Sequence, residues 1–139
     1  MRSLVRSGLI IALMWGLIGA CGCGNPSAKG VADTFVAAMV SGDTLAAAQH
    51  WDYVTYARKQ NPDWDTFATS QKNLIIKEAK FAEKRAEELD YWKLHFPRGT
   101  EVDNIIEEGD SAIAQLKGGR AAELNLIKVE DAWYVSAIK

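Results

Sequence analysis

Residues 101–138 read EVDNIIEEGDSAIAQLKGGRAAELNLIKVEDAWYVSAI, and this stretch decides the fold. Short turn sequences divide it at Gly109-Asp110, Gly118-Gly119 and Glu130-Asp131. Apolar and polar residues alternate between the turns, which is typical of strands with one buried face. The pattern predicts strands at Glu101–Glu107, Ser111–Lys117, Ala121–Val129 and Ala132–Ile138. Because the turns are short, we expect neighbouring strands to pair antiparallel in a meander.

The last predicted strand also indicates which side chains share a face. Simple alternation places Trp133 and Val135 on one face of the sheet and Tyr134 and Ile138 on the other. A meander of this size is not stable alone, so its apolar face must pack on helices. The segment before the strands must supply those helices.

That segment has helical periodicity. Val31, Phe35, Ala38 and Met39 recur at helical spacing and predict a helix over residues 31–40. Ser41-Gly42-Asp43 then provides a glycine C-cap and an acidic N-cap, so a second helix is expected from Thr44 to about Arg58.

A third and longest helix is expected after the break at Asn61-Pro62-Asp63, with Asp63 as its cap. It begins near Trp64, and Pro97-Arg98-Gly99 ends the region. One apolar stripe would run along it, through Trp64, Phe67, Leu74, Ile75, Ala79, Ala82, Ala86 and Leu89. The charged residues on the opposite side are expected to face solvent. Residues 30–139 are therefore predicted to form an α+β domain, with N-terminal helices packed on a curved four-stranded antiparallel meander.

The first twenty residues have the features of an export signal. Arg2 and Arg6 precede an apolar run from Leu9 to Ala20. As a helix this run would be about 18 Å long, too short for the roughly 30 Å core of a bilayer. A charged start, a short apolar centre and small residues at the end are typical of a secretory signal over residues 1–20.

The end of the run, Ile18-Gly19-Ala20-Cys21, resembles the lipobox of bacterial lipoproteins. The resemblance implies cleavage before Cys21 and a lipid anchor on its sulfur. It also implies a place in the cell membrane, facing the periplasm or the exterior. In such lipoproteins an Asp after the lipidated Cys is the usual signal for staying in the inner membrane. Gly22 at this position therefore favours the outer membrane if the cell has two membranes. The alternatives are an ordinary cleaved signal, or lipidation shifted to Cys23.

Residues 21–29 are small and polar and predict a flexible tether after the anchor. Without the signal, 14 basic and 18 acidic side chains remain, a net charge of about −4. Acidity and export together disfavour nucleic acid as a partner.

Several short sequence segments resemble those of small bacterial lipoproteins with a nuclear transport factor two-like domain, also described as cystatin-like or lumazine-binding-like. They are Phe35-Val36-Ala37-Ala38, Ser41-Gly42-Asp43, Gly109–Ile113 and Leu126–Val135. The resemblance implies a cone-like fold with a pocket between helices and sheet. It implies no activity, because proteins of this fold include enzymes, binders and adaptors.

Aromatic side chains are the better guide to a site. Tyr and Trp suit surfaces that are apolar on one side and wet at the tip. The candidate pocket residues are Trp51, Tyr53, Tyr56, Tyr91, Trp92, His95 and Tyr134. The alternative is that these rings fill the core. We expect a non-catalytic domain that binds a small apolar ligand or an envelope protein, without a cofactor or metal. A structural or assembly role, as a homodimer through the sheet face, is a further alternative.

The alternative function is a cofactor-free isomerase, dehydratase or hydrolase. It would need His50 or His95 in a cleft with a carboxylate in reach, and Asp52 is the near neighbour of His50. Asp103 and Glu123 could point into a cavity, but one face of such a sheet is usually solvated. The sequence contains no phosphate-binding glycine loop, nucleophile elbow or zinc pattern.

The lipid anchor gives a direct prediction. Cys21→Ala should abolish membrane association, because one sulfur carries the diacylglyceryl group, whereas Cys23→Ser should leave it intact. Fractionation of cells after a high-salt wash measures this. Cys21→Ala protein that stays with the membranes would rule out lipidation at this residue.

Overall fold

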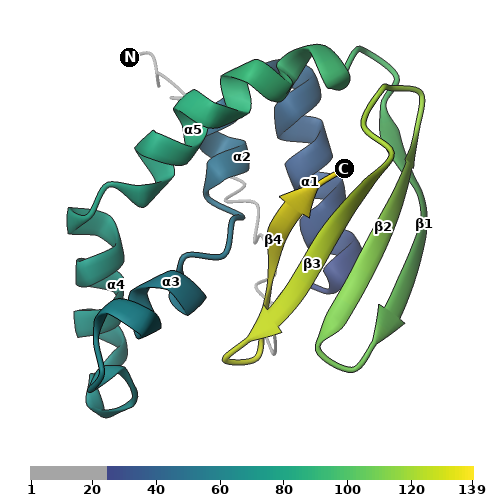
Figure 1. Cartoon of the computed structure of the whole chain (residues 1–139). Helices are drawn as coiled ribbons and strands as arrows, with labels where there is room; N and C mark the ends of the chain where they lie inside the picture. Colours follow the sequence, from purple (N-terminus) through teal and green to yellow (C-terminus); the bar gives the residue numbers. More distant parts are fainter. Residues whose placement is uncertain (1–24) are drawn as a thin grey trace, which may run out of the picture.

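All four predicted strands are present, and they form one antiparallel meander. A computed structural model describes residues 25–139 as an α+β domain (Figure 1). The strands are β1 (Glu101–Glu108), β2 (Ser111–Lys117), β3 (Glu123–Val129) and β4 (Ala132–Ile138). They lie in the order β1-β2-β3-β4, and every neighbouring pair is antiparallel. β3 begins two residues later than expected because the Ala121 amide donates to the carbonyl of His95 instead. The predicted signal, Cys21 and Cys23 lie outside the described residues.

A bulge in β4 corrects the predicted faces. Leu126 pairs with Val135, but the next residue back, Asn125, pairs with Ala137, so Ser136 is an extra residue in β4. One extra residue reverses the alternation beyond it. Ile138 therefore packs in the same core as Trp133 and Val135, and not with Tyr134.

Helix α1 (Ala28–Ser41) packs across the inner face of the sheet. Phe35 and Met39 are fully buried, as the periodicity predicts. The helix begins three residues earlier than expected, because the Ser27 hydroxyl accepts a hydrogen bond from the Gly30 amide at 3.0 Å. At the other end Gly42 has a left-handed backbone, and Asp43 caps the next helix. The predicted Gly-Asp junction is confirmed.

The predicted helix from Thr44 to Arg58 is wrong, because it divides into α2 (Thr44–Ala48) and α3 (Val54–Gln60). Between them the chain pairs with the edge of β4. The Val135 amide donates to the His50 carbonyl at 2.7 Å, and the Asp52 amide donates to the Val135 carbonyl at 2.9 Å. The edge strand thus supplies the partners that a continued helix would have supplied.

The predicted long helix is also interrupted. It consists of η1 (Trp64–Thr66), α4 (Thr69–Glu78), α5 (Phe81–Trp92) and η2 (Lys93–His95). Lys80, with φ of 53°, breaks the helix between α4 and α5. Asp63 makes no side-chain cap. The expected single stripe is therefore wrong, and Leu74 within it is 53% exposed.

The apolar residues form two cores on opposite faces of the sheet. Leu124, Leu126, Trp133 and Val135 pack with α1, and Ala82, Ala86 and Leu89 of α5 complete that core. The alternate residues Ile127, Val129 and Tyr134 pack with Val54, Ala57 and Trp64. The chain passes from one core to the other around the β4 edge, and Figure 1 shows α3 and α4 standing beyond that edge.

The hairpin glycines give a matched stability test. Gly118 has φ of +81°, and an added Cβ would lie 2.3 Å from the carbonyl oxygen of Gly99. Gly109 has φ of +58° and open space. Gly109→Ala should cost about 1–2 kcal/mol for the left-handed backbone. Gly118→Ala should cost about 2–5 kcal/mol, because overpacking adds about 1–3 kcal/mol. Urea unfolding measures both, and equal costs would contradict the close approach of Gly99.

Candidate functional site

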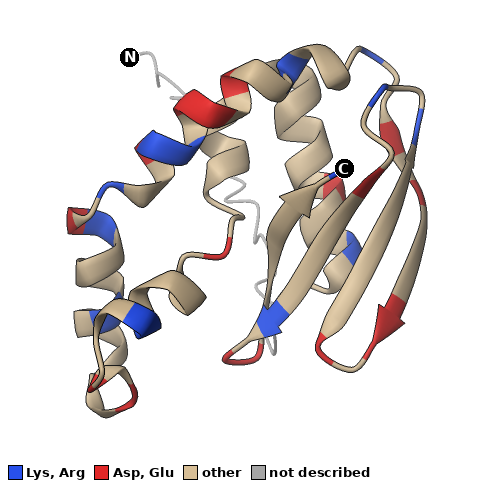
Figure 2. Ribbon diagram, viewed as in Figure 1, with Lys and Arg blue, Asp and Glu red and all other residues tan. Residues whose placement is uncertain are grey.

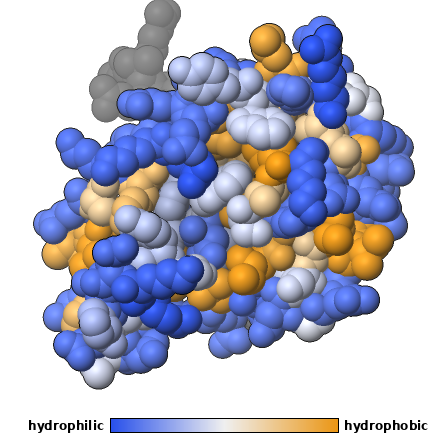
Figure 3. Space-filling model, in the orientation of Figure 1, coloured by the Kyte–Doolittle hydropathy of each residue, from blue (hydrophilic) through white to orange (hydrophobic). Residues whose placement is uncertain are grey.

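A cavity of about 790 Å³ lies where α3, η1 and α4 meet the β4 edge and the start of α5. Its volume is within the usual range for small-molecule sites. Four aromatic side chains line it, namely Trp51, Tyr53, Trp64 and Tyr134. Polar residues complete the walls, among them Asn25, Gln49, Lys72, Asn73, Lys77, Glu83 and Glu130. In Figure 3, apolar surface shows between the hydrophilic residues of this face.

Trp51 lies on the segment that pairs with β4, and its surroundings fix its ring. The guanidinium carbon of Arg85 lies 4.4 Å from the ring centre, a cation–π contact. On the other side the ring packs against Phe35, with centres 6.2 Å apart. Trp51 therefore joins the main core to the cavity.

Tyr53 forms the wall between this cavity and a smaller hollow of about 260 Å³. Its hydroxyl donates to the Ala48 carbonyl at 2.6 Å, and its ring stacks on Phe81 with centres 5.7 Å apart. Burial raises the pKa of Tyr53, with Arg85 opposing and nearby glutamates reinforcing that shift. Tyr53 is therefore a neutral hydrogen-bond donor at neutral pH.

Tyr134 and Trp64 form the opposite wall. Trp64 is fully buried, and its indole lies against Phe67. Tyr134 is half-buried beside the same cluster. Burial raises the pKa of Tyr134, and the charges of Asp52 and Glu130 add to that shift. Both residues reach the cavity because the second core holds the α3–α4 segment against β4.

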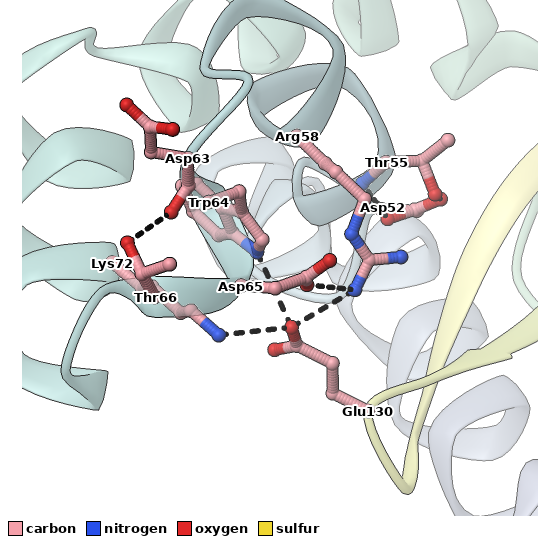
Figure 4. Close-up of polar contacts among 9 residues, drawn as sticks. All are labelled: Asp52, Thr55, Arg58, Asp63, Trp64, Asp65, Thr66, Lys72 and Glu130. Atoms are coloured by element: carbon pink, nitrogen blue, oxygen red, sulfur yellow. Dashed lines mark hydrogen bonds and ion pairs between the residues drawn. The ribbon is translucent and has the colours of Figure 1, made fainter.

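Glu130 is the polar centre of the site (Figure 4). Its Oε1 accepts from Arg58 Nη2 at 3.0 Å, Trp64 Nε1 at 3.2 Å and Lys72 Nζ at 3.2 Å. Asp65 lies 3.5 Å from the same guanidinium nitrogen of Arg58. One carboxylate oxygen thus connects the β3–β4 turn to α3, η1 and α4.

The turn that carries Glu130 has an unusual backbone. Glu130 and Asp131 have φ of 51° and 65°, values that glycine and asparagine adopt more readily. Partial burial raises the pKa of Glu130, but hydrogen bonds from Lys72 and Trp64 and the charges of Lys72 and Arg58 outweigh it. The net shift is downward from 4.5. The carboxylate stays ionised and binds the cations around it.

The predicted pocket residues divide into three groups. Trp51, Tyr53 and Tyr134 line the large cavity, and Tyr56 lines the smaller hollow with Tyr53 and Phe81. Tyr91, Trp92 and His95 line neither. They lie together at the α5–η2 end, where Tyr91 is 84% exposed and the Trp92 and His95 rings are 5.1 Å apart. Helix α5 runs away from the cavity, which separates this group from the others.

The sequence reasoning missed Trp64, Lys72 and Glu130 as site residues. Trp64 was expected in a helical stripe, and Lys72 has no distinctive neighbours. One signal was available for Glu130. It stands in a two-residue hairpin turn, where asparagine and glycine are favoured. Its partners could not be found from sequence, because they lie 58–72 residues away.

Among the described residues, neither histidine forms an acid–base pair with a carboxylate near it in the sequence. His50 is half-buried, and burial lowers its pKa. Both oxygens of Asp52 accept hydrogen bonds from Thr55, at 3.1 and 2.6 Å, so Asp52 caps α3. Within residues 25–139, no ion pair or hydrogen bond joins the side chain of either histidine to a carboxylate, and neither histidine lines either hollow.

Asp103 and Glu123 lie at the surface and not in the cavity. Asp103 is exposed and pairs with Lys117 at 3.2 Å, while Glu123 pairs with Lys139 at 3.3 Å. In the described part of the chain, no group of three histidine, cysteine or acidic residues is placed to hold a metal ion. No helix within that part is long and apolar enough to cross a bilayer.

Comparison with known proteins gave no match. No family model fits the sequence, no curated protein is significantly similar to it, and no solved structure is significantly similar to its fold. The proposed function therefore rests on the geometry of residues 25–139.

Glu130 predicts how stability depends on pH. Its pKa is lower in the folded state, so ionised Glu130 stabilises the fold above about pH 4.5, and this contribution is lost as the pH falls through the folded-state pKa. Because exposed ion pairs contribute about 0.2–1 kcal/mol, Glu130→Gln should cost about 1 kcal/mol at pH 7 and less at pH 3. Urea unfolding at both pH values measures the difference.

Glu108→Gln is the matched control for Glu130→Gln. Glu108 lies at the β1–β2 turn and forms no ion pair with another described residue. Its replacement should change stability little at either pH. Parallel stability curves for wild type and Glu130→Gln between pH 7 and pH 3 would contradict the role of Glu130.

Proposed function

We propose that this chain is a lipid-anchored bacterial envelope protein whose domain binds a small, partly apolar ligand without catalysis. The observation that carries the proposal is the 790 Å³ cavity, where Trp51, Tyr53, Trp64 and Tyr134 face polar side chains. Aromatic walls with a few placed polar groups are the usual lining of a ligand site. The lipobox-like Ile18–Cys21 supports the membrane location.

The rings of the cavity are held in place before any ligand binds. Arg85 and Phe35 contact Trp51, Phe81 stacks on Tyr53, and Trp64 donates to Glu130. Side chains that are already fixed lose little conformational entropy on binding. Such a site favours a ligand with a planar or apolar body and a polar end.

The cone-like, nuclear transport factor two-like assignment belongs to the same proposal. Helices that lie against an antiparallel sheet, with a cavity between them, are compatible with it. The cavity of this chain is at the β4 edge, between the α3–α4 segment and the sheet. In a cone-like domain the ligand would then enter beside β4.

The alternative of a cofactor-free enzyme has no specific observation in its favour. It required His50 or His95 beside a carboxylate in a cleft, and the histidines line neither hollow. Glu130 and Lys72 of the large cavity bind each other, so neither is a free acid or base. We therefore propose a binding function and not catalysis.

A blocking variant tests the cavity. Asn73 is an exposed residue of α4 that lines it, so Asn73→Trp should fill the space without disturbing a core. Ser70→Trp is the control, because Ser70 is exposed on the same helix and outside the cavity lining. Native mass spectrometry of gently purified protein should show added mass on wild type and Ser70→Trp that disappears on unfolding.

Asn73→Trp should lack this added mass while it unfolds at the same urea concentration as Ser70→Trp. Equal ligand mass on both variants would place the ligand elsewhere. A wild-type protein that carries no ligand, and gains none from a lipid extract of the same cells, would reject the binding function.

A further inference from the structure

The N-terminal end of the described chain is fixed beside the β3–β4 turn. The Asn25 side-chain amide donates to the Asp131 carbonyl at 2.9 Å. Ser27 caps α1, and Ala28 after it is fully buried. Because Ala28 and Val31 pack in the core, the first turn of α1 cannot unwind without exposing them. The part of the chain that is fixed on the domain therefore includes Asn25, which also lines the cavity.

The tether is short. Cys21 and Asn25 are four residues apart, so their Cα atoms are at most about 14 Å apart. This step rests on the proposed lipidation of Cys21. The polar headgroup layer is about 5–7 Å thick on each side of a bilayer. Asn25 and the β3–β4 turn must then stay within about 10 Å of the headgroup surface.

The other end of the domain lies beyond that reach. β3 has seven residues, about 23 Å, between the β3–β4 turn and the β2–β3 turn. The His95 carbonyl accepts from Arg120 and Ala121 in the β2–β3 turn, which places η2 at that far end. Leu94 in η2 is 80% exposed, and it would contact the bilayer only if the domain lay on its side.

We propose that the Asn25 end of the domain faces the membrane surface, and that the cavity binds the headgroup of a zwitterionic membrane amphiphile. Asn25 and Glu130 are part of both this end and the cavity wall. The walls carry two cations, Lys72 and Lys77, and two anions, Glu83 and Glu130. Lys77 and Glu83 form no ion pair with another described residue, so one charge of each sign is available to a headgroup.

The charge of this end favours a neutral surface. Acidic residues occupy the tips of both hairpin turns there (Figure 2), with Glu108 and Asp110 on one and Glu130 and Asp131 on the other. The Lys128 amide donates to the Asp110 carbonyl, so the two turns are adjacent. Arg58 and Lys72 neutralise Glu130, but Glu108, Asp110 and Asp131 form no ion pair with another described residue. Anionic lipids would therefore repel these three carboxylates within a Debye length, about 8–10 Å at physiological salt. A zwitterionic headgroup meets no such repulsion.

Short-range quenching tests the orientation. The full chain with Cys23→Ser, processed and lipidated in cells, is inserted into phosphatidylcholine vesicles that contain a nitroxide-headgroup lipid. A fluorophore is placed on Asp131→Cys, Asp110→Cys or Leu94→Cys. Fluorescence at 131 and 110 should be quenched several-fold more than at 94. Adding phosphatidylglycerol should weaken the quenching at low salt, and high salt should restore it.

A longer tether is the matched control. Twenty Gly and Ser residues inserted after Gly24 have a root-mean-square length of about 25 Å. This insertion should remove most of the difference between positions 131 and 94, while the protein still floats with the vesicles. Flotation with equal quenching at 131 and 94 would overturn the orientation and leave lipidation standing. Failure of the unmodified chain to float would overturn both proposals.

Native mass spectrometry of protein released from mixed vesicles tests the ligand. One phosphatidylethanolamine should remain bound to wild type and Ser70→Trp, in preference to phosphatidylglycerol, and should be absent from Asn73→Trp. A protein that binds another added ligand in the cavity but no lipid would overturn the headgroup assignment and keep the proposed binding function.

Discussion

The pairing of residues 50–52 with Val135 is the constraint on which the rest of the structure depends. Two backbone hydrogen bonds there end α2 and turn the chain around the β4 edge. They also cover an edge that would otherwise expose unpaired backbone groups. The opposite edge, β1, is protected differently, by the charged residues Glu101, Asp103, Glu107 and Glu108. Among the described residues, the large cavity lies at the β4 edge.

The crossing at β4 creates the second core and, with it, the cavity. Because α3 and α4 lie beyond the β4 edge (Figure 1), Trp64 packs in one cluster with Val129 and donates to Glu130. No residue of α4 is buried, so this segment is held mainly by the small core and by the contacts of Glu130. The part of the wall that α4 contributes is therefore less constrained than the rings of Trp51, Tyr53 and Trp64, which their neighbours hold in place.

The position of Asn25 links the site to the proposed membrane anchor. Asn25 lines the cavity and donates a hydrogen bond to the β3–β4 turn, and it lies only four residues after Cys21, the site of the proposed anchor. Under that proposal, the short spacing would keep this end of the cavity near the membrane surface.

Much of the sheet and of α1 could be predicted from the sequence, because their information is local. The turns at Gly109 and Gly118 and the alternation in Leu124 and Leu126 are read within a few residues. The helix caps at Gly42 and Asp43 are local in the same way. Three of the candidate pocket aromatics, Trp51, Tyr53 and Tyr134, also line the cavity.

The rest was decided only by tertiary structure. Residues 44–58 and 64–89 each have a helical pattern, and packing against β4 and the left-handed Lys80 divide them. The bulge at Ser136 moves Ile138 to the other face because register depends on the partner strand. Glu130 becomes the centre of the site only when residues 58–72 positions away fold onto its turn. Helices and strands whose signals lie within a few residues could thus be predicted from the sequence alone. The places where these elements cross and pack could not, because the contacts there join residues far apart in the chain and form only in the tertiary structure.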